Sequence, residues 1–229
     1  MKRAACATFA ALLLWVAAGQ AATTADLFHA VEIDSVRDVR RIVEERVVDT
    51  KALDERGDTA LIAAIRSDAA RVTDYLIAEK STDLDATNVS SETAMMIAAY
   101  RKRKDLVEKL IARGAEPNRP GWTALHYAAS VDARDIVDVL LEHSAFIDAE
   151  SPNKTTPLMM AARGGYGDLC RSLIAAGADP SQINQRDLTA ADFARRAGDP
   201  ELGQWLDSQS TAWRAKYGTS SARRPTADQ

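Results

Sequence analysis

The sequence predicts an all-α repeat solenoid of about six stacked helix-turn-helix units with short β-hairpin or loop fingers between them. Five similar segments begin with a threonine, at Thr59, Thr93, Thr123, Thr156 and Thr189, at spacings of 34, 30, 33 and 33 residues. Each segment is rich in alanine, and a second apolar helical pattern follows it. Because so short a helix pair buries too little surface alone, it needs similar units stacked on both sides.

Residues 121–145 show the unit most clearly. Ala124, Leu125 and Ala128 place small apolar residues on one face of a first helix. Ile136 and Leu140 place larger ones on a second helix. We therefore expect every seam between units to be made largely of alanine and leucine.

These segments resemble the ankyrin repeat. The resemblance is carried by the pattern T-[AP]-L-x-x-A-A, by LDERGDTAL at 53–61 and GADP at 177–180, and by pairs such as Leu76–Ile77 and Leu140–Leu141. It covers residues 25–207. It implies units near 25–54, 55–86, 87–117, 118–150, 151–183 and 184–207, within a repeat domain of 22–208. The sixth unit is expected to be the C-terminal cap of the stack. Residues 209–229 are expected to add a helical extension and a disordered tail.

Residues 1–21 have the composition of a secretory signal peptide. Lys2 and Arg3 precede an uncharged run from Ala4 to Ala18, and Gly19-Gln20-Ala21 offers small residues for cleavage. The alternative is a transmembrane anchor, but the run is short and rich in alanine. Cys6 lacks the preceding residues of a lipoprotein cysteine. We expect export to a Gram-negative periplasm, or secretion, with no stable membrane insertion after cleavage.

The net charge and the number of cysteines narrow the range of possible functions. Without residues 1–21, 27 basic residues face 33 acidic ones, a net charge of −6, so no nucleic-acid partner is expected. Cys170 is then the only cysteine, and no internal disulfide can form. Its place in the second helix matches Val137 of the preceding unit, which favours a buried apolar role; the alternative is a redox thiol.

Nothing in the sequence indicates chemistry. There is no HExxH, no P-loop, no GxSxG and no cysteine–histidine cluster of zinc spacing. We expect a non-enzyme without cofactor or metal, monomeric, that works through a surface. The resemblance assigns His126 a structural hydrogen-bonding role.

In the ankyrin family, partners bind the concave surface of the fingers and first helices. Carried over by position, the resemblance implies that partner-binding residues lie in several units. They are Arg56, Asp58, Arg66, Glu92, Tyr100, Arg101, Trp122, Ser130, Asn153 and Arg163. Tyr100, Arg101 and Trp122 are expected to form one central cluster with the composition of a binding hot spot.

Two features leave alternatives open. The run Arg101 to Lys104 lies in an interhelical turn and is either a solvated edge or a positive patch. The finger at Asn118 to Gly121 is short, so Trp122 either faces the groove as an interface anchor or folds back over the finger.

We expect an exported adaptor or protective partner of another periplasmic protein, such as a stress-response enzyme of the catalase kind. The alternative is an immunity protein that blocks a toxin. A third hypothesis, a redox protein that uses Cys170, depends on the exposure of that thiol.

Overall fold

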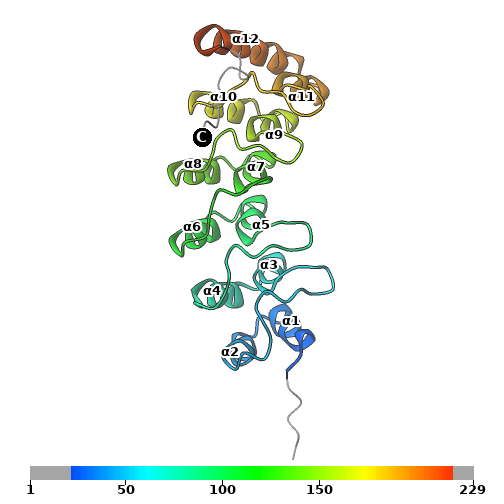
Figure 1. Cartoon of the computed structure of the whole chain (residues 1–229), viewed down its shortest axis with the longest axis vertical. Helices are drawn as coiled ribbons and strands as arrows, with labels where there is room; N and C mark the ends of the chain where they lie inside the picture. Colours follow the sequence, from blue (N-terminus) through cyan, green and yellow to red (C-terminus); the bar gives the residue numbers. More distant parts are fainter. Residues whose placement is uncertain (1–21, 219–229) are drawn as a thin grey trace, which may run out of the picture.

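The structure, a computed structural model, describes residues 22–218. Within that range twelve α-helices form pairs stacked along one axis (Figure 1). Their bounds are α1 Thr24–Glu32, α2 Val36–Glu44, α3 Ala60–Arg66, α4 Ala70–Ala78, α5 Ala94–Tyr100, α6 Lys104–Ala112, α7 Ala124–Ser130, α8 Arg134–Glu142, α9 Pro157–Arg163, α10 Gly167–Ala175, α11 Ala190–Arg196 and α12 Pro200–Tyr217. The expected signal peptide at 1–21 and the tail from 219 lie outside the described residues and stay predictions.

The expected all-α repeat solenoid is confirmed. The odd-numbered first helices form one column and the even-numbered second helices another, and loops project as fingers beside the first helices (Figure 1). Between residues 22 and 218 the β-structure is limited to an isolated bridge between Leu53 and Thr59. Most fingers are therefore loops, and those at 88–92, 151–155 and 184–188 are each closed by a backbone hydrogen bond such as the one from Asn88 N to Glu92 O.

The repeated threonines mark where the first helices begin. The side chains of Thr59, Thr93, Thr156 and Thr189 each accept a hydrogen bond from the backbone N–H three residues later. This satisfies one of the amide groups that the first turn of a helix leaves without a partner. The sequence spacing of the threonines thus fixes the register of the stack.

The core is a continuous seam of small and medium side chains. Ala98, Ala128 and Ala161 are fully buried on the first helices, and Leu110 and Leu140 face them from the second helices. Alanine lets neighbouring first helices approach closely, and the leucines fill the space between the two columns. The predicted alanine-and-leucine seam is therefore present.

Cys170 belongs to this core. Its side chain has no exposed surface, and burial raises the pKa of its thiol to about 12. A reactive thiol needs access and a lowered pKa. The redox hypothesis is wrong for this site, and the buried apolar role is confirmed.

The basic run at 101–104 is a solvated edge whose arginines are paired. Arg101 donates to Asp68 Oδ2 at 2.5 Å, and Arg103 donates to both carboxylate oxygens of Asp105 at 3.0 Å. Lys102 takes a left-handed backbone conformation at φ 57°, where other units of this stack have aspartate or glycine. The positive charges of the two arginines in this run are therefore largely neutralised by carboxylates of the same molecule.

The last helix closes the stack. α12 is twice the length of α10, and Leu206 is buried while the Trp205 ring packs against the core. At Gly203 an added Cβ would lie 3.1 Å from the carbonyl oxygen of Ala191, so glycine allows α12 to cross α11 closely. No helix between residues 22 and 218 combines the length and apolarity needed to cross a membrane.

Candidate protein-binding face

Three positions in each unit place side chains on the side of the fingers. Counted from the capping threonine, they are position −1 at the end of the finger and positions +4 and +7 on the first helix. We call this set the finger face. From the second to the sixth unit its residues are Asp58, Ala63, Arg66, Glu92, Ile97, Tyr100, Trp122, Tyr127, Ser130, Thr155, Met160, Arg163, Leu188, Phe193 and Arg196. Its chemical character changes along the stack.

The N-terminal part of the finger face is a closed polar network. Arg66 pairs with Asp58 at 3.0 Å and with Glu92 at 2.6 Å. The Asn88 amide donates to both carboxylates at 2.8 Å. Tyr127 donates its hydroxyl to the other oxygen of Glu92 at 2.8 Å. Burial, together with this bond, raises the pKa of Tyr127, so the phenol remains protonated and keeps donating.

The middle of the finger face is aromatic. The rings of Tyr100 and Tyr127 meet edge to face at 6.2 Å. Beside them lies an apolar pocket of about 220 Å³, lined by Tyr100, Trp122, His126, Tyr127, Ser130 and Met160. Tyr100 is 55% exposed, so its ring is available to a partner. A pocket of this size and lining suits one apolar side chain.

His126 forms part of the wall of this apolar pocket and is fully buried. Its Nε2 lies 2.9 Å from the carbonyl oxygen of Thr155, which can only accept, so Nε2 carries the proton. Its Nδ1 accepts from the backbone N–H of Thr123 at 3.2 Å. Burial lowers the pKa of His126 to about 4, so the ring is neutral. The structural role implied by the ankyrin resemblance is confirmed.

The C-terminal part of the finger face is basic. A second pocket, of about 540 Å³, is lined by three arginines, Arg163, Arg186 and Arg196, and no carboxylate. Its other walls are Asn153, Asn184, Thr155, Trp122, Met160, Leu188, Phe193 and Ala197. Because Trp122 and Met160 line both pockets, the aromatic and basic regions are adjacent.

The structure brings some of the predicted binding residues together and separates others. Tyr100, Trp122 and Ser130 share the apolar pocket, and Trp122, Asn153 and Arg163 share the basic one. Trp122 therefore lies on the finger face. Arg101, the third member of the expected cluster, instead pairs with Asp68 at the helix turn.

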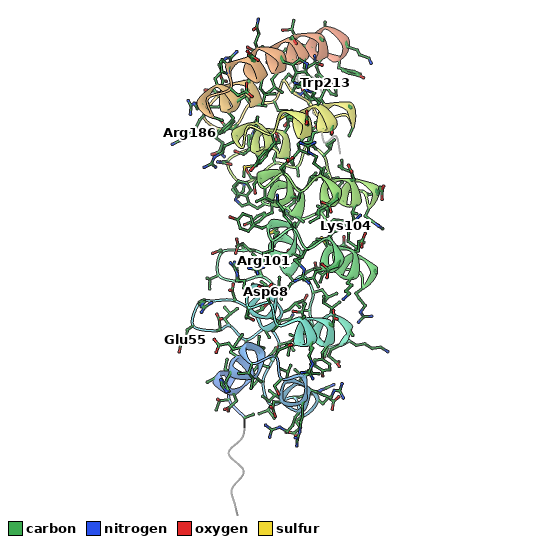
Figure 2. The ribbon with its side chains drawn as sticks, turned by 180° about the vertical axis from the view of Figure 1, so that it is seen from behind. Glu55, Asp68, Arg101, Lys104, Arg186 and Trp213 are labelled. Carbon is green, nitrogen blue, oxygen red and sulfur yellow. The ribbon has the colours of Figure 1, made fainter. Side chains whose placement is uncertain are left out.

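The remaining predicted residues lie toward the N-terminal end. Arg66 forms ion pairs with both Asp58 and Glu92, and Asp58 is only 4% exposed. Arg56 is exposed on its finger, next to Glu55. Glu55 projects on the same side of the stack as Arg186 (Figure 2). These charges therefore differ in their availability to a partner.

The sequence analysis did not name Tyr127, Met160, Arg186 or Arg196, which line the two pockets. Tyr127 and Met160 fall at position +4, an x in the pattern T-[AP]-L-x-x-A-A, to which no role had been assigned. Arg186 and Arg196 belong to the sixth unit, which had been interpreted as a cap. Their positions match those of Arg56 and Arg66 in the second unit, so extending the register by one unit would have found both.

This arrangement defines a class of protein: a helical repeat stack that presents a shaped surface of aromatic and charged side chains. Among residues 22–218 no three His, Cys, Asp or Glu side chains lie close enough together to hold a metal ion. What the finger face offers is contact area, hydrogen-bond donors and charge.

Comparison with known proteins identifies the family. The family model for ankyrin repeats in three copies matches residues 27–120 and 95–187. The chain belongs to the ankyrin-repeat family, whose members are generally protein-binding modules without enzyme activity.

Curated relatives match part of this chain and a small part of their own length. Neurogenic locus notch homolog protein 1 of Xenopus tropicalis is 36% identical over 127 residues, which is 54% of this chain. The notch homolog protein 4 of Homo sapiens is 42% identical over 94 residues, or 39% of this chain. The matched region spans about 5% of the length of either relative.

A solved structure is similar over most of the stack. It is a chain from the complex of the predatory endopeptidase Bd0816 of Bdellovibrio bacteriovorus with the immunity protein Bd3460. The similarity has a TM-score of 0.67 at 26% sequence identity, and covers 82% of this chain and 99% of that chain.

Proposed function

We propose that this chain is an exported protein that binds one partner protein through the finger face and blocks it, as an immunity protein does. The observation that carries the proposal is the apolar pocket between Tyr100, Trp122 and Tyr127. Aromatic rings around a pocket of side-chain size, with Tyr100 exposed and Trp122 and Tyr127 half-buried, are typical of a binding hot spot. The low conformational entropy of tyrosine and tryptophan favours this use.

The likeness to a chain from an endopeptidase–immunity protein complex supports inhibition over protection. Export is supported by the composition of residues 1–21, with lysine and arginine ahead of an uncharged run. A blocking protein must meet its target in the same compartment. We therefore propose the periplasm as its place of action and a hydrolytic enzyme that acts there as its target.

An affinity pull-down from periplasmic extract, read by mass spectrometry, tests this proposal. The wild-type protein is expected to retain one protein in stoichiometric amount. A Tyr100→Ala/Trp122→Ala variant is expected to lose it, because truncating two hot-spot residues costs at least about 2 kcal/mol of binding, or about thirtyfold in Kd. A Phe146→Ala/Tyr217→Ala variant is the matched control, since both rings are exposed and neither lines the apolar pocket.

The retained protein then separates blocking from protection. An immunity protein is expected to abolish the activity of its partner enzyme at a ratio of one to one. A protective adaptor would instead leave that activity intact and lengthen the lifetime of the partner under oxidative or thermal stress. Equal retention by the wild-type protein and the Tyr100→Ala/Trp122→Ala variant would show that the finger face is not the binding surface.

A further inference from the structure

The basic pocket at the C-terminal end of the finger face holds arginines that the molecule itself does not neutralise. Arg163, Arg186 and Arg196 line it, and none of them has a carboxylate within salt-bridge distance among residues 22–218. Asp192, four residues before Arg196, pairs with Arg195 at 3.4 Å, and Asp199, three residues after Arg196, accepts the backbone N–H of Leu202 at the start of α12. Three cations thus share one pocket in a chain whose net charge is −4.

The second unit shows how the same geometry is neutralised. Arg66 occupies position +7, and its guanidinium pairs with Asp58 at position −1 of its own unit and with Glu92 at position −1 of the next. Arg163 occupies the same position in the fifth unit. The two corresponding −1 residues there are Thr155 and Leu188, which carry no charge. The repeat therefore places Arg163 at the position where Arg66 meets two carboxylates, and provides none at the two corresponding −1 positions.

The residues around these arginines indicate which chemical groups the basic pocket can bind. A guanidinium fork binds a carboxylate through two parallel hydrogen bonds, and the amide side chains of Asn153 and Asn184 add donors to the same pocket. Trp122 and Met160 form a wall shared with the apolar pocket. One short segment can therefore place an apolar side chain in one pocket and carboxylates in the other.

We infer that the basic pocket binds an acidic segment of the partner protein, one that carries at least two carboxylates beside an apolar side chain. This inference rests on the proposed function and specifies the partner's surface. The pairing is selective because the N-terminal part of the finger face has its charges already satisfied. Among the finger-face arginines of residues 22–218, an acidic segment thus finds those without a salt bridge, Arg163 and Arg196, at the C-terminal end.

A peptide titration followed by NMR tests the inference without the natural partner. The probe is a capped pentapeptide with one phenylalanine between two pairs of acidic residues, added to ¹⁵N-labelled protein up to millimolar concentration. The arginine Nε–Hε signals of Arg163, Arg186 and Arg196 are expected to shift. A peptide with glutamine and asparagine in place of its acidic residues is expected to bind at least about tenfold more weakly, and added salt is expected to weaken only the acidic peptide.

Two variants make the test specific. Arg163→Gln/Arg186→Gln/Arg196→Gln removes the cations, and its matched control removes three exposed arginines of the second helices, Arg37→Gln/Arg41→Gln/Arg71→Gln. Leu188→Glu instead restores the internal carboxylate that Glu92 supplies to Arg66. The first triple variant and Leu188→Glu are each expected to weaken peptide binding at least about tenfold. The control triple variant is expected to bind as the wild type does.

Equal binding of the neutral and acidic peptides would overturn the inference. So would an unchanged peptide affinity in the Arg163→Gln/Arg186→Gln/Arg196→Gln variant or in folded Leu188→Glu. A third contradicting result is tighter binding of an oligothymidylate whose charge equals that of the peptide. The last would assign the pocket to a nucleic acid. Failure of the proposed function looks different, because it would appear as the absence of a specific partner in the pull-down while the acidic peptide still binds.

Discussion

The hydroxyl of Tyr127 donates a 2.8 Å hydrogen bond to Glu92 Oε1, across the seam between the third and fourth units. The same tyrosine ring meets Tyr100 edge to face and lines the apolar pocket. One side chain therefore joins the charged network of the N-terminal units to the aromatic centre of the finger face. The orientation of the Tyr127 ring is therefore coupled to the ion pair between Glu92 and Arg66.

The ion pairs of Arg66 are expected to stabilise the fold. Arg66→Ala leaves the buried carboxylate of Asp58 with the Asn88 amide as its remaining side-chain donor. We expect the free energy of unfolding to fall by about 1–3 kcal/mol in urea denaturation. Arg56→Ala, which removes an exposed arginine of the same unit, is the control and should change it by less than about 0.5 kcal/mol. Equal losses in the two variants would contradict the network.

The alanine seam should not tolerate larger side chains. Ala128 is fully buried between neighbouring first helices, as are Ala98 and Ala161. Ala128→Leu is expected to cost about 1–3 kcal/mol through overpacking, seen as a lower Tm in circular dichroism melts. Ala175→Leu, at an exposed site on α10, provides the control for the change in composition. An unchanged Tm for Ala128→Leu would place the seam elsewhere.

Stability is expected to fall in mild acid because of His126. Burial lowers its pKa in the folded protein to about 4, whereas an unfolded histidine titrates near 6.5. Above pH 6.5 both states hold a neutral ring and the effect is absent. Between pH 6.5 and 4 the unfolded state takes up the proton first, so the free energy of unfolding decreases by up to about 3 kcal/mol.

Urea denaturation between pH 7 and 4 would measure this loss. A His126→Gln variant keeps an amide near the carbonyl oxygen of Thr155 but cannot titrate. Carboxylates titrate in both proteins, so the difference between their pH profiles isolates the histidine. Parallel profiles through this range would show that His126 is not buried in its neutral form.

Cys170 is expected to be inert in the folded protein. The thiol is fully buried and its pKa is raised to about 12, so almost no thiolate exists at pH 8. Iodoacetamide should leave the Cys170 tryptic peptide unmodified in native buffer and alkylate it in urea. Mass spectrometry distinguishes this peptide from the one that contains Cys6. Rapid native alkylation of Cys170 would revive a redox role.

The fold could be predicted because the repeat signal is local. Each capping threonine starts a first helix, and the spacing of those threonines alone gives the stack. The fingers were less predictable: the sequence left hairpins and loops open, and among residues 22–218 the fingers are loops except at the Leu53–Thr59 bridge.

The sequence predicts which residues lie on the finger face, but it does not predict which of the charged ones form ion pairs. Tyr100 and Trp122 were found because the repeat register places them on the finger face. Whether an arginine is neutralised depends instead on which residue the neighbouring unit presents. That difference separates Arg66, which is paired on both sides, from Arg163, which is not. Treating the sixth unit as a cap also hid Arg196, which continues the same series.

The separation of the finger face from the alanine seam also matters for how such a protein changes over generations. Tyr100, Arg163 and Arg196 extend from the ends of first helices, whereas Ala98 and Ala161 on two of those helices hold the stack together. A mutation at one of the outer codons alters recognition and leaves the scaffold untouched. When a partner protein diverges, the finger face can follow one codon at a time, and each intermediate remains a folded protein on which selection can act.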